Sequence, residues 1–435
     1  MKNIAILGAA GRDYHNFLVK YKDNPLYKVK FFTAAQIPGI EKRSFPKELA
    51  GKLYKEDIPF FSEDKLVELI KKYDIDEVVL SYSDLSHNDV MHKASIALSC
   101  GANFVMLGPK ETMIKSKKPV ISVCAVRTGA GKSQTSKKIA QILKENGKRV
   151  VAIRHPMPYG DLIKEKVQRF ATYEDLTINK CTIEEREEYE PWIKSGFIIY
   201  AGVDYKEILD KAEKEADVIL WDGGNNDFSF YHSDLLFVVA DPHRPGHELL
   251  YHPGETNIRM ADIIIINKID TAKKEQIKIL ENNINSVNKK AVIIKAESEI
   301  TLSSKLSLKG KRALVIEDGP TLTHGGMKIG AGFIIAKRKG CKIVSPIKYA
   351  VGSIKETYKK YSHLKYVLPA MGYSSNQIKD LEKTINKTPC DIVIDGSPVN
   401  LSRLIKINKP IIDVAYSLKE KGLSLKEVLK KNGFI

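Results

Sequence analysis

Residues 120–146 combine an apolar run, a loop of small residues and a helical pattern, and this order constrains the fold more than any other feature. The run 120–126 predicts a buried strand, and 134–146 has the periodicity of a helix. Between them stands Arg127-Thr128-Gly129-Ala130-Gly131-Lys132-Ser133. Small residues let successive backbone N–H groups point at phosphates, while a lysine offsets their charge and a hydroxyl suits Mg²⁺. The segment therefore predicts a phosphate-binding loop, although Val126 replaces the first glycine of the GxxxxGKS pattern.

We expect this loop to hold a nucleoside triphosphate, with Lys132 in contact with the transferred phosphoryl group as a catalytic residue. The predicted nucleotide-binding residues of the loop are Thr128, Gly129, Ala130, Gly131, Lys132, Ser133 and Gln134.

A second run predicted to be a buried strand, residues 217–221, is followed by an acidic residue, Asp222, and then by Gly223 and Gly224. A carboxylate at the end of a buried strand is costly unless a cation offsets its charge. In phosphate-loop proteins Mg²⁺ supplies that charge, and glycines let the backbone approach the γ-phosphate. Asp222 is therefore predicted to be catalytic and to share Mg²⁺ with Ser133. The alternative is an aspartate that caps a turn.

A third motif, Asn267-Lys268-Ile269-Asp270, follows the apolar run 262–266. It resembles the guanine-recognition motif of GTPases. In that interpretation the Asp270 carboxylate accepts hydrogen bonds from guanine N1–H and N2–H, and the Lys268 stem packs along the base. Adenine presents the reverse pattern of donors and acceptors, so the motif favours GTP. Asn267, Lys268 and Asp270 are thus predicted to bind nucleotide.

Arginine and histidine follow two other strands, where open α/β sheets bind ligands. Arg154-His155 follows the run 150–153, and a segment with two histidines and an arginine follows 235–240. Arginine with imidazole suits a phosphorylated small molecule. A metal site built from His243, His247 and His252, or histidines held by local hydrogen bonds, are the alternatives. The predicted substrate-binding residues are Arg154, His155, His243, Arg244, His247 and His324, with Arg154 and Arg244 also catalytic.

Strand and helix patterns alternate along all 435 residues, which predicts an α/β protein with parallel sheets. The length exceeds one core, and we expect three consecutive α/β units. These are an N-terminal Rossmann-like domain (1–117), a P-loop NTPase domain (118–310), and a Gly-rich segment with a small C-terminal α/β domain (311–435). Residues from 154 to about 200 are expected to be rich in loops. The acidic stretch 184–192 is expected to be a solvated helix face, or alternatively a lid that offsets a cationic pocket.

The composition and charge of the chain limit the classes of partner that we expect. No apolar run reaches a membrane span, and the first residues lack the pattern of a signal peptide, so we expect a cytoplasmic protein without a membrane partner. The net charge is +17, but arginines and aromatic residues do not cluster as in nucleic-acid binders. We therefore expect no nucleic-acid partner, and a positive field that attracts polyanionic substrates. Five scattered cysteines predict neither a disulfide framework nor a thiolate metal site.

The order of the three nucleotide motifs resembles the SIMIBI class of P-loop proteins, and residues 119–275 look like the urease and hydrogenase maturation GTPases. Over its whole length the chain resembles the cyclic 2,3-diphosphoglycerate synthetase family and related predicted GTPases. The resemblance rests on the N-terminal Rossmann-like unit, the phosphate loop, Glu317-Asp318-Gly319-Pro320-Thr321, Thr323-His324-Gly325-Gly326, Leu368-Pro369-Ala370-Met371-Gly372-Tyr373-Ser374 and Asp395-Gly396-Ser397-Pro398.

That resemblance implies a ligase that uses ATP to form an intramolecular phosphoanhydride, with release of ADP and phosphate. Mg²⁺, Lys132, Arg154 and Arg244 would stabilise the charges that meet in such a site. The expected partners are ATP or GTP and a phosphorylated small molecule, and a homo-oligomer is left open. The alternative is a regulatory or metallochaperone-like GTPase, in which hydrolysis drives a conformational switch.

Overall fold

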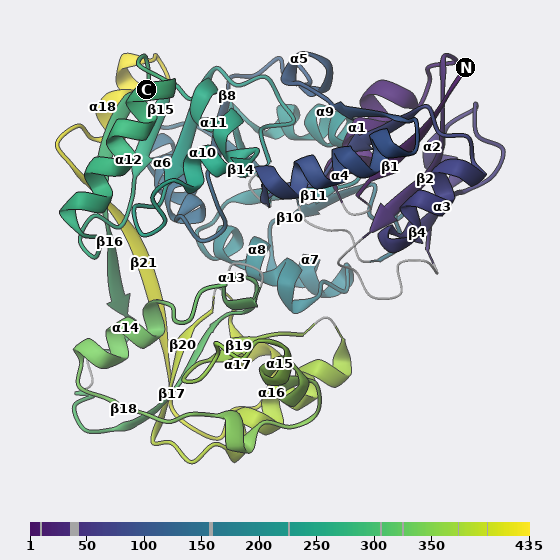
Figure 1. Ribbon diagram of the computed structural model, residues 1–435. Coiled ribbons are helices and arrows are strands. Elements are labelled where there is room, and N and C mark those ends of the chain that lie inside the picture. The colour runs from purple at the N-terminus through teal and green to yellow at the C-terminus, as the bar shows by residue number, and fades with distance from the viewer. Residues whose placement is uncertain are drawn as a thin grey trace. The chain divides into compact units, whose positions relative to one another are not determined.

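The computed structural model describes residues 1–8, 11–34, 43–155, 160–224, 227–304, 307–323, 326–372, 374–397 and 399–435. These residues form two compact units, and parallel strands alternate with helices in both (Figure 1). The α/β class is therefore confirmed. The first unit comprises Met1–Arg169, Ile199–Lys295 and Lys421–Ile435; the second comprises Phe170–Ile198 and Ala296–Glu420.

The N-terminal part of the first unit is a six-stranded sheet with the order β3-β4-β2-β1-β5-β7. All of its pairs are parallel except β3 with β4. Apolar clusters cover both of its faces, as the alternation of strands and helices requires. Its strands are β1 (Lys2–Leu7), β2 (Tyr27–Ala34), β3 (Ser44–Phe45), β4 (Ile58–Ser62), β5 (Glu77–Leu80) and β7 (Asn103–Met106). Its helices are α1 (Arg12–Asn16), η1 (Phe17–Tyr21), α2 (Lys47–Ala50), η3 (Glu63–Lys65), α3 (Leu66–Lys72), α4 (His87–Ser99) and α5 (Pro109–Thr112).

The second sheet of this unit has the order β10-β11-β9-β12-β8-β13-β15-β16. Its central strands are buried along their whole length, which explains their unbroken apolar sequences. The strands are β8 (Val120–Ala125), β9 (Val150–Ile153), β10 (Val167–Phe170), β11 (Ile198–Gly202), β12 (Val218–Trp221), β13 (Leu235–Ala240), β15 (Ile263–Ile266) and β16 (Val292–Leu302). The helices are α6 (Lys132–Glu145), α9 (Tyr205–Glu215), α10 (His247–Leu250), α11 (Gly254–Met260), α12 (Lys274–Val287) and α18 (Leu425–Lys431), and β6 (Leu85–Ser86) pairs with β14 (Tyr251–His252).

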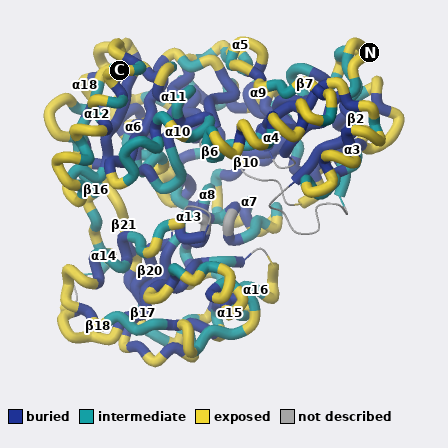
Figure 2. Tube along the Cα trace, in the orientation of Figure 1, coloured by how far each residue is buried: buried dark blue, intermediate teal, exposed yellow. Residues whose placement is uncertain are grey.

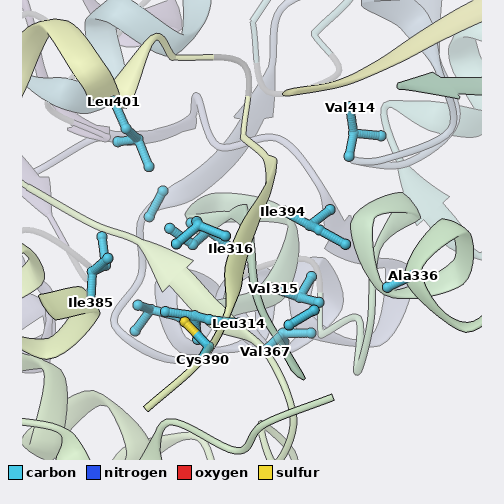
Figure 3. Packing of buried hydrophobic residues seen from close by; sticks show 14 of the residues in the cluster. Leu314, Val315, Ile316, Ala336, Val367, Ile385, Cys390, Ile394, Leu401 and Val414 are labelled. Carbon is cyan, nitrogen blue, oxygen red and sulfur yellow. The ribbon is translucent and has the colours of Figure 1, made fainter. Parts of the chain in front are cut away.

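The second unit is built on β17, which pairs with β20 on one side and with β18 and β19 on the other. Its core includes Leu314, Val315 and Ile316 of β17 and Ile394 of β20 (Figure 3), and both strands are dark with burial in Figure 2. The strands are β17 (Arg312–Asp318), β18 (Lys342–Ile343), β19 (Leu368–Ala370), β20 (Ile392–Gly396) and β21 (Ile411–Lys421). The helices are α7 (Tyr173–Ile178), α8 (Ile183–Lys194), α13 (Gly319–Thr323), α14 (Ala331–Arg338), η4 (Ile347–Tyr349), α15 (Gly352–Lys360), α16 (Ser375–Lys387) and α17 (Leu401–Leu404).

Two expectations for the segment after β9 are wrong. Residues 170–198 form α7 and α8, each begun by a capping box, rather than a region rich in loops. The acidic stretch is not a solvated face, since Glu185, Glu187 and Glu190 are buried. Glu190 accepts a hydrogen bond from the backbone N–H of Asn400 at 2.9 Å, and Ile183 belongs to the core of the second unit. These contacts join residues far apart in sequence, so no local pattern indicates them.

The chain passes between the units at four places, near residues 170, 198, 295 and 421. The division into three domains at 117/118 and 310/311 stays a prediction. No helix in the described part of the chain is both long enough and apolar enough to cross a lipid bilayer.

Candidate nucleotide and substrate site

The predicted phosphate loop connects β8 to α6, as the sequence pattern requires. Gly129 and Gly131 have φ angles of +81° and +110°, which side chains rarely tolerate. A Cβ on Gly131 would also lie 2.1 Å from Nδ2 of Asn267. Helix α6 begins at Lys132, so the N-terminal end of the helix lies at the loop, where an anion is stabilised.

Asp222, at the end of β12, lies between two cations. Its Oδ1 is 2.9 Å from Lys132 Nζ, and its Oδ2 is 2.5 Å from Arg154 Nη1. Ser136 donates a further hydrogen bond to Oδ1 at 2.6 Å. Burial alone would raise the pKa of this fully buried carboxyl, but Lys132 and Arg154 hold it below its usual value. The structure thus brings together three residues predicted to be catalytic: Lys132, Asp222 and Arg154.

The Lys132 ammonium is buried beside a second cation. Burial and the charge of Arg154 lower the pKa of Lys132 to about 8, against the opposite effect of Asp222. Asp222 supplies a single negative charge between these two cations, so the three groups together keep a net positive charge. A triphosphate placed against the loop would therefore interact strongly with both Lys132 and Arg154.

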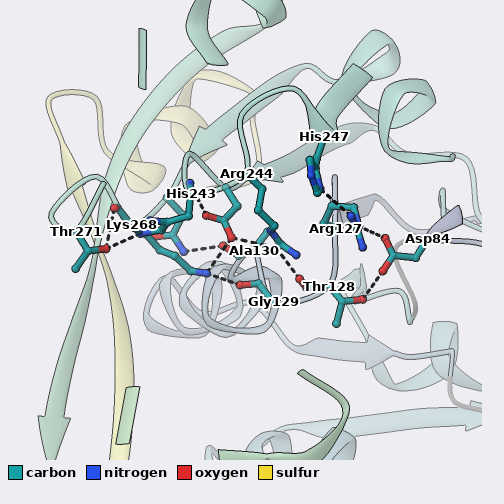
Figure 4. A network of polar contacts seen from close by, with 12 residues as sticks. Asp84, Arg127, Thr128, Gly129, Ala130, His243, Arg244, His247, Lys268 and Thr271 are labelled. Atoms are coloured by element: carbon teal, nitrogen blue, oxygen red, sulfur yellow. Dashed lines mark hydrogen bonds and ion pairs between the residues drawn. The ribbon is translucent and has the colours of Figure 1, made fainter. Parts of the chain in front are cut away.

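The third motif contacts the loop from the other side (Figure 4). Asn267 Nδ2 donates to the Ala130 carbonyl at 2.9 Å, and Lys268 Nζ donates to the Gly129 carbonyl at 2.6 Å. These bonds satisfy two carbonyls of the loop from the side chains of the 267–270 motif. The Asp270 carboxylate is exposed, as contact with a base would require.

A second buried carboxylate, Asp241, connects the motif to Arg244. Its Oδ2 lies 3.1 Å from Lys268 Nζ and 3.0 Å from Arg244 Nη2, and these cations lower the pKa of Asp241 although burial opposes them. Arg244 Nη2 also donates to the Thr128 carbonyl at 2.7 Å. Arg244, predicted to be catalytic, is therefore positioned at the loop.

The predicted histidines do not converge on one point. His243 Nε2 is 2.9 Å from Thr271 Oγ1, whereas His247 Nδ1 is 2.7 Å from Arg127 Nη1 (Figure 4). Within the described ranges, no group of three or more His, Cys, Asp or Glu side chains is arranged to hold a metal. The three-histidine alternative therefore gains no support. His324 lies outside the described residues.

Several site residues were not predicted from the sequence. Asp84 accepts from Arg127 Nε at 2.5 Å and from Thr128 Oγ1 at 3.0 Å, so a residue just after β5 of the first sheet contacts the loop of the second. No local pattern indicates such a contact. Ser136 could have been predicted from the sequence, because residues four apart share a helix face and Ser136 follows Lys132 by four positions.

His155 lies beside Asp227 and Arg12 rather than at the phosphate loop. Its Nδ1 is 3.1 Å from Asp227 Oδ2, and Arg12 Nε is 3.5 Å from Asp227 Oδ1. Arg12 follows β1 and belongs to the N-terminal sheet, so this cluster also joins the two sheets of the first unit. Neither Arg12 nor Asp227 was predicted as a site residue.

Comparison with known proteins gives one relative that matches nearly the whole chain. The arginine synthetase ArcE of Thermococcus kodakarensis is 62% identical over 432 residues, which cover 99% of this chain and 96% of the relative. The cyclic 2,3-diphosphoglycerate synthetase of Thermococcus sibiricus is 26% identical over 278 residues, 60% of this chain and 62% of the relative. No family model matches. The LpxK structure from Aquifex aeolicus in complex with ATP aligns with a TM-score of 0.43 and 16% identity, over 74% of this chain and 89% of that one.

Both named relatives are synthetases, which supports an enzyme of the ligase type. The resemblance to the cyclic 2,3-diphosphoglycerate synthetases is confirmed, at a lower identity than the match to ArcE.

Proposed function

Because this chain belongs to the family of the arginine synthetase ArcE, we propose that it catalyses the nucleoside-triphosphate-dependent synthesis of arginine. The observation that carries the proposal is the 62% identity with that relative over 99% of the chain. The match therefore extends through both compact units, well beyond the phosphate loop. The acceptor proposed here is an amino acid, in place of the phosphorylated small molecule expected from the sequence.

The chemical structure of arginine limits which substrates a ligase could join to make it. Its side chain ends in a carbon bonded to three nitrogens, and a ligase can make the last C–N bond by first activating a C–O bond. The ureido oxygen of citrulline, the ureido counterpart of arginine, would attack the γ-phosphorus and release the nucleoside diphosphate. Ammonia would then attack the activated carbon, and phosphate would leave. The balance is citrulline, ammonia and NTP giving arginine, NDP and phosphate.

The described residues support this chemistry at the phosphate end. Lys132 and Arg154 are cations fixed by Asp222, and Arg244 is held against the Thr128 carbonyl. Such preorganised charges stabilise a transferred phosphoryl group without reorganisation. Mg²⁺ prefers oxygen ligands, and the Ser133 hydroxyl is of that kind. The Asp222 carboxylate would be a second ligand only after exchanging a bond to Lys132, Ser136 or Arg154, which together engage both of its oxygens. When bound, Mg²⁺ would offset charge on the β- and γ-phosphates.

A second candidate is the reaction for which the more distant relatives are named, synthesis of cyclic 2,3-diphosphoglycerate. The 26% identity with one of these enzymes favours it, and the same phosphate loop would serve it.

The test is an assay of the purified protein with Mg²⁺ and either ATP or GTP. We expect arginine and phosphate to appear mole for mole when citrulline and ammonium are both present, and no arginine when either is omitted. Turnover with 2,3-bisphosphoglycerate but not with citrulline would favour the second candidate. Slow hydrolysis that neither acceptor accelerates would contradict both and favour a switch GTPase.

The preference of the protein for GTP or ATP tests whether the 267–270 motif recognises the base. If Asp270 accepts hydrogen bonds from guanine, GTP should bind roughly ten- to a hundredfold more tightly than ATP. Asp270→Asn should weaken GTP and favour xanthosine triphosphate, whose C2 carbonyl can accept from the new amide. Glu275→Gln, at an exposed position on α12, is the matched control. A wild type that prefers ATP, with Asp270→Asn unchanged for all three nucleotides, would show that the motif only supports the loop.

A further inference from the structure

Arg12, His155 and Asp227 form a buried polar cluster beside the nucleotide site. The three side chains are 6%, 3% and 3% exposed. Nη1 of Arg12 and Nε2 of His155 have no hydrogen-bond partner among the described residues. His155 Nδ1 and Arg12 Nε face the Asp227 carboxylate as ion pairs, at 3.1 and 3.5 Å, without the geometry of a hydrogen bond. Buried polar atoms without partners are costly, so a native protein that keeps several together usually has a use for them.

The Arg12 guanidinium is nevertheless fixed in place. Its Nη2 donates to the Phe228 carbonyl at 2.6 Å, and its Cζ lies 4.0 Å from the centre of the Phe228 ring and 4.4 Å from that of Phe230. Cation–π contacts of this kind orient an arginine without using its other donors. Arg12 therefore presents unused N–H groups from a rigid position.

His155 is equally constrained by glycines. A Cβ on Gly11 would lie 1.6 Å from His155 Nε2, and a Cβ on Gly224 would lie 1.8 Å from the His155 carbonyl oxygen. Gly11 therefore leaves room for the His155 ring, and Gly224 leaves room for the His155 backbone.

The cluster occupies a place where α/β sheets bind ligands. Arg12 follows β1, which lies between β2 and β5 where the strand order of the first sheet reverses. His155 and Asp227 follow the adjacent strands β9 and β12 of the second sheet. Arg154, the residue before His155, pairs with Asp222 of the phosphate site. The two residues that follow β9 therefore belong to neighbouring sites: Arg154 to the phosphate site and His155 to the cluster.

The charges of the cluster select the ligand. Asp227 carries a carboxylate beside the single guanidinium of Arg12, and Asp13, whose Oδ1 accepts from the N–H groups of Gly11 and Tyr14, adds a second carboxylate close by. Burial lowers the pKa of His252 to about 4, so that neighbour supplies no positive charge. A phosphate dianion would meet net repulsion here, whereas a molecule with one positive and one negative end would match both partners.

We propose that Arg12 and Asp227 hold the two ends of an α-amino-acid zwitterion: the carboxylate at Arg12 and the ammonium group at Asp227. The assignment rests on the proposed function, because it makes this cluster the subsite for the backbone of the amino-acid acceptor and of arginine. His155, whose Nδ1 is 3.1 Å from Asp227 Oδ2, holds the Asp227 carboxylate in position. The side chain of the ligand then extends toward Arg154 and Asp222, where the phosphoryl group is transferred.

The test uses the full-length protein with nucleotide present and three ligands measured by calorimetry. They are arginine, agmatine, which lacks the carboxylate, and 5-guanidinovalerate, which lacks the α-amino group. We expect the wild type to bind arginine roughly ten- to a hundredfold more tightly than either analogue, since each lacks one charge-assisted interaction. Equal affinity for all three would overturn the proposal, and this arm requires no variant to fold.

Two variants test the two ends of the ligand separately. Arg12→Gln should lose the preference for arginine over agmatine but keep the preference over 5-guanidinovalerate, and Asp227→Asn should do the opposite. A merely structural ion pair would change the affinities of all three ligands together, which would also overturn the proposal. Nucleotide affinity reports on folding, and Arg12→Lys should restore part of the preference. Arg149→Gln, which removes an exposed partner of Asp217 in the same unit, should leave every ratio unchanged.

The two proposals fail separately. Arginine synthesis without the reciprocal pattern would leave the proposed function standing and refute the subsite. The reciprocal pattern without arginine synthesis would establish the subsite and refute the function.

Discussion

Asp222 and Glu317 occupy the same kind of place in the two units, near the carboxyl end of a buried parallel strand, yet their environments are opposite. Asp222 faces Lys132 and Arg154, and its pKa is lowered although burial opposes this. Glu317 accepts a hydrogen bond from the Phe333 backbone N–H at 2.8 Å and others from Gly330 and Gly332, and burial raises its pKa to about 8. At Glu317 the backbone N–H groups offset less of the effect of burial on the pKa than the two cations do at Asp222.

The same holds for Asp395 at the end of β20. Ser397 donates to its Oδ1 from the hydroxyl at 2.7 Å and from the backbone at 2.9 Å, but burial still raises the pKa to about 7. A strand that ends in an acidic residue therefore does not by itself indicate a phosphate site. The cations that face the carboxylate decide its role, and they come from other strands and helices.

The largest expected difference is in stability. Asp222→Asn leaves two buried cations without a counterion and should lower the free energy of unfolding at pH 7 by about 3–5 kcal/mol. Glu317→Gln replaces a carboxyl that is mostly protonated at this pH, so the loss should stay near the ~1 kcal/mol of an altered hydrogen bond. Denaturant titrations of both variants measure the contrast. Equal losses would mean that the two carboxyls are held in the same way.

The next largest effect is on activity. Lys132→Ala removes a positioned cation and should reduce nucleoside-triphosphate turnover by about 10²–10³, while the fold is retained. Lys144→Ala, at an exposed position on the same helix, should have no effect. Undiminished turnover in Lys132→Ala would contradict the phosphate-loop assignment.

The raised pKa of Glu317 predicts a dependence of stability on pH. The folded protein binds a proton at this group over the range between its usual value of 4.5 and about 8. The stability it contributes is complete below pH 4.5 and is lost as the pH rises through about 8. Between pH 6 and 9, Glu317→Gln should therefore lose less stability than the wild type, by roughly 1–3 kcal/mol. Glu356→Gln, which removes a partner of the exposed Lys359, is the control. Parallel curves of unfolding free energy against pH for the wild type and both variants would contradict the raised pKa of Glu317.

The smallest effect concerns nucleotide affinity. With a pKa of about 8, Lys132 is charged below that pH and attracts phosphate most strongly there. Affinity should therefore fall by up to about tenfold for each pH unit above 8. Lys132→Arg, whose charge persists throughout, should show a flat profile between pH 7.5 and 9.5. A wild-type profile equally flat in that range would place the ammonium in a more solvated environment.

The sequence alone determined the parts of the site that lie within one strand and the loop after it. The strand, glycines, lysine and helix between residues 120 and 146 have distinct local signals, and so do Asp222 and the 267–270 motif, because periodicity and turn chemistry act over a few residues. The structure places these motifs around one loop, as their order implied.

Which charges meet depends on the packing of elements that are far apart in the sequence. Asp84 reaches Arg127 and Thr128 from the first sheet, Arg12 joins His155 and Asp227, and residues 170–198 leave the second sheet to join the core around β17. The pKa of Lys132 and that of Glu317 likewise depend on burial and on partners far along the chain. Periodicity encodes which face of an element is apolar, but the pairing of charges across elements follows from three-dimensional packing.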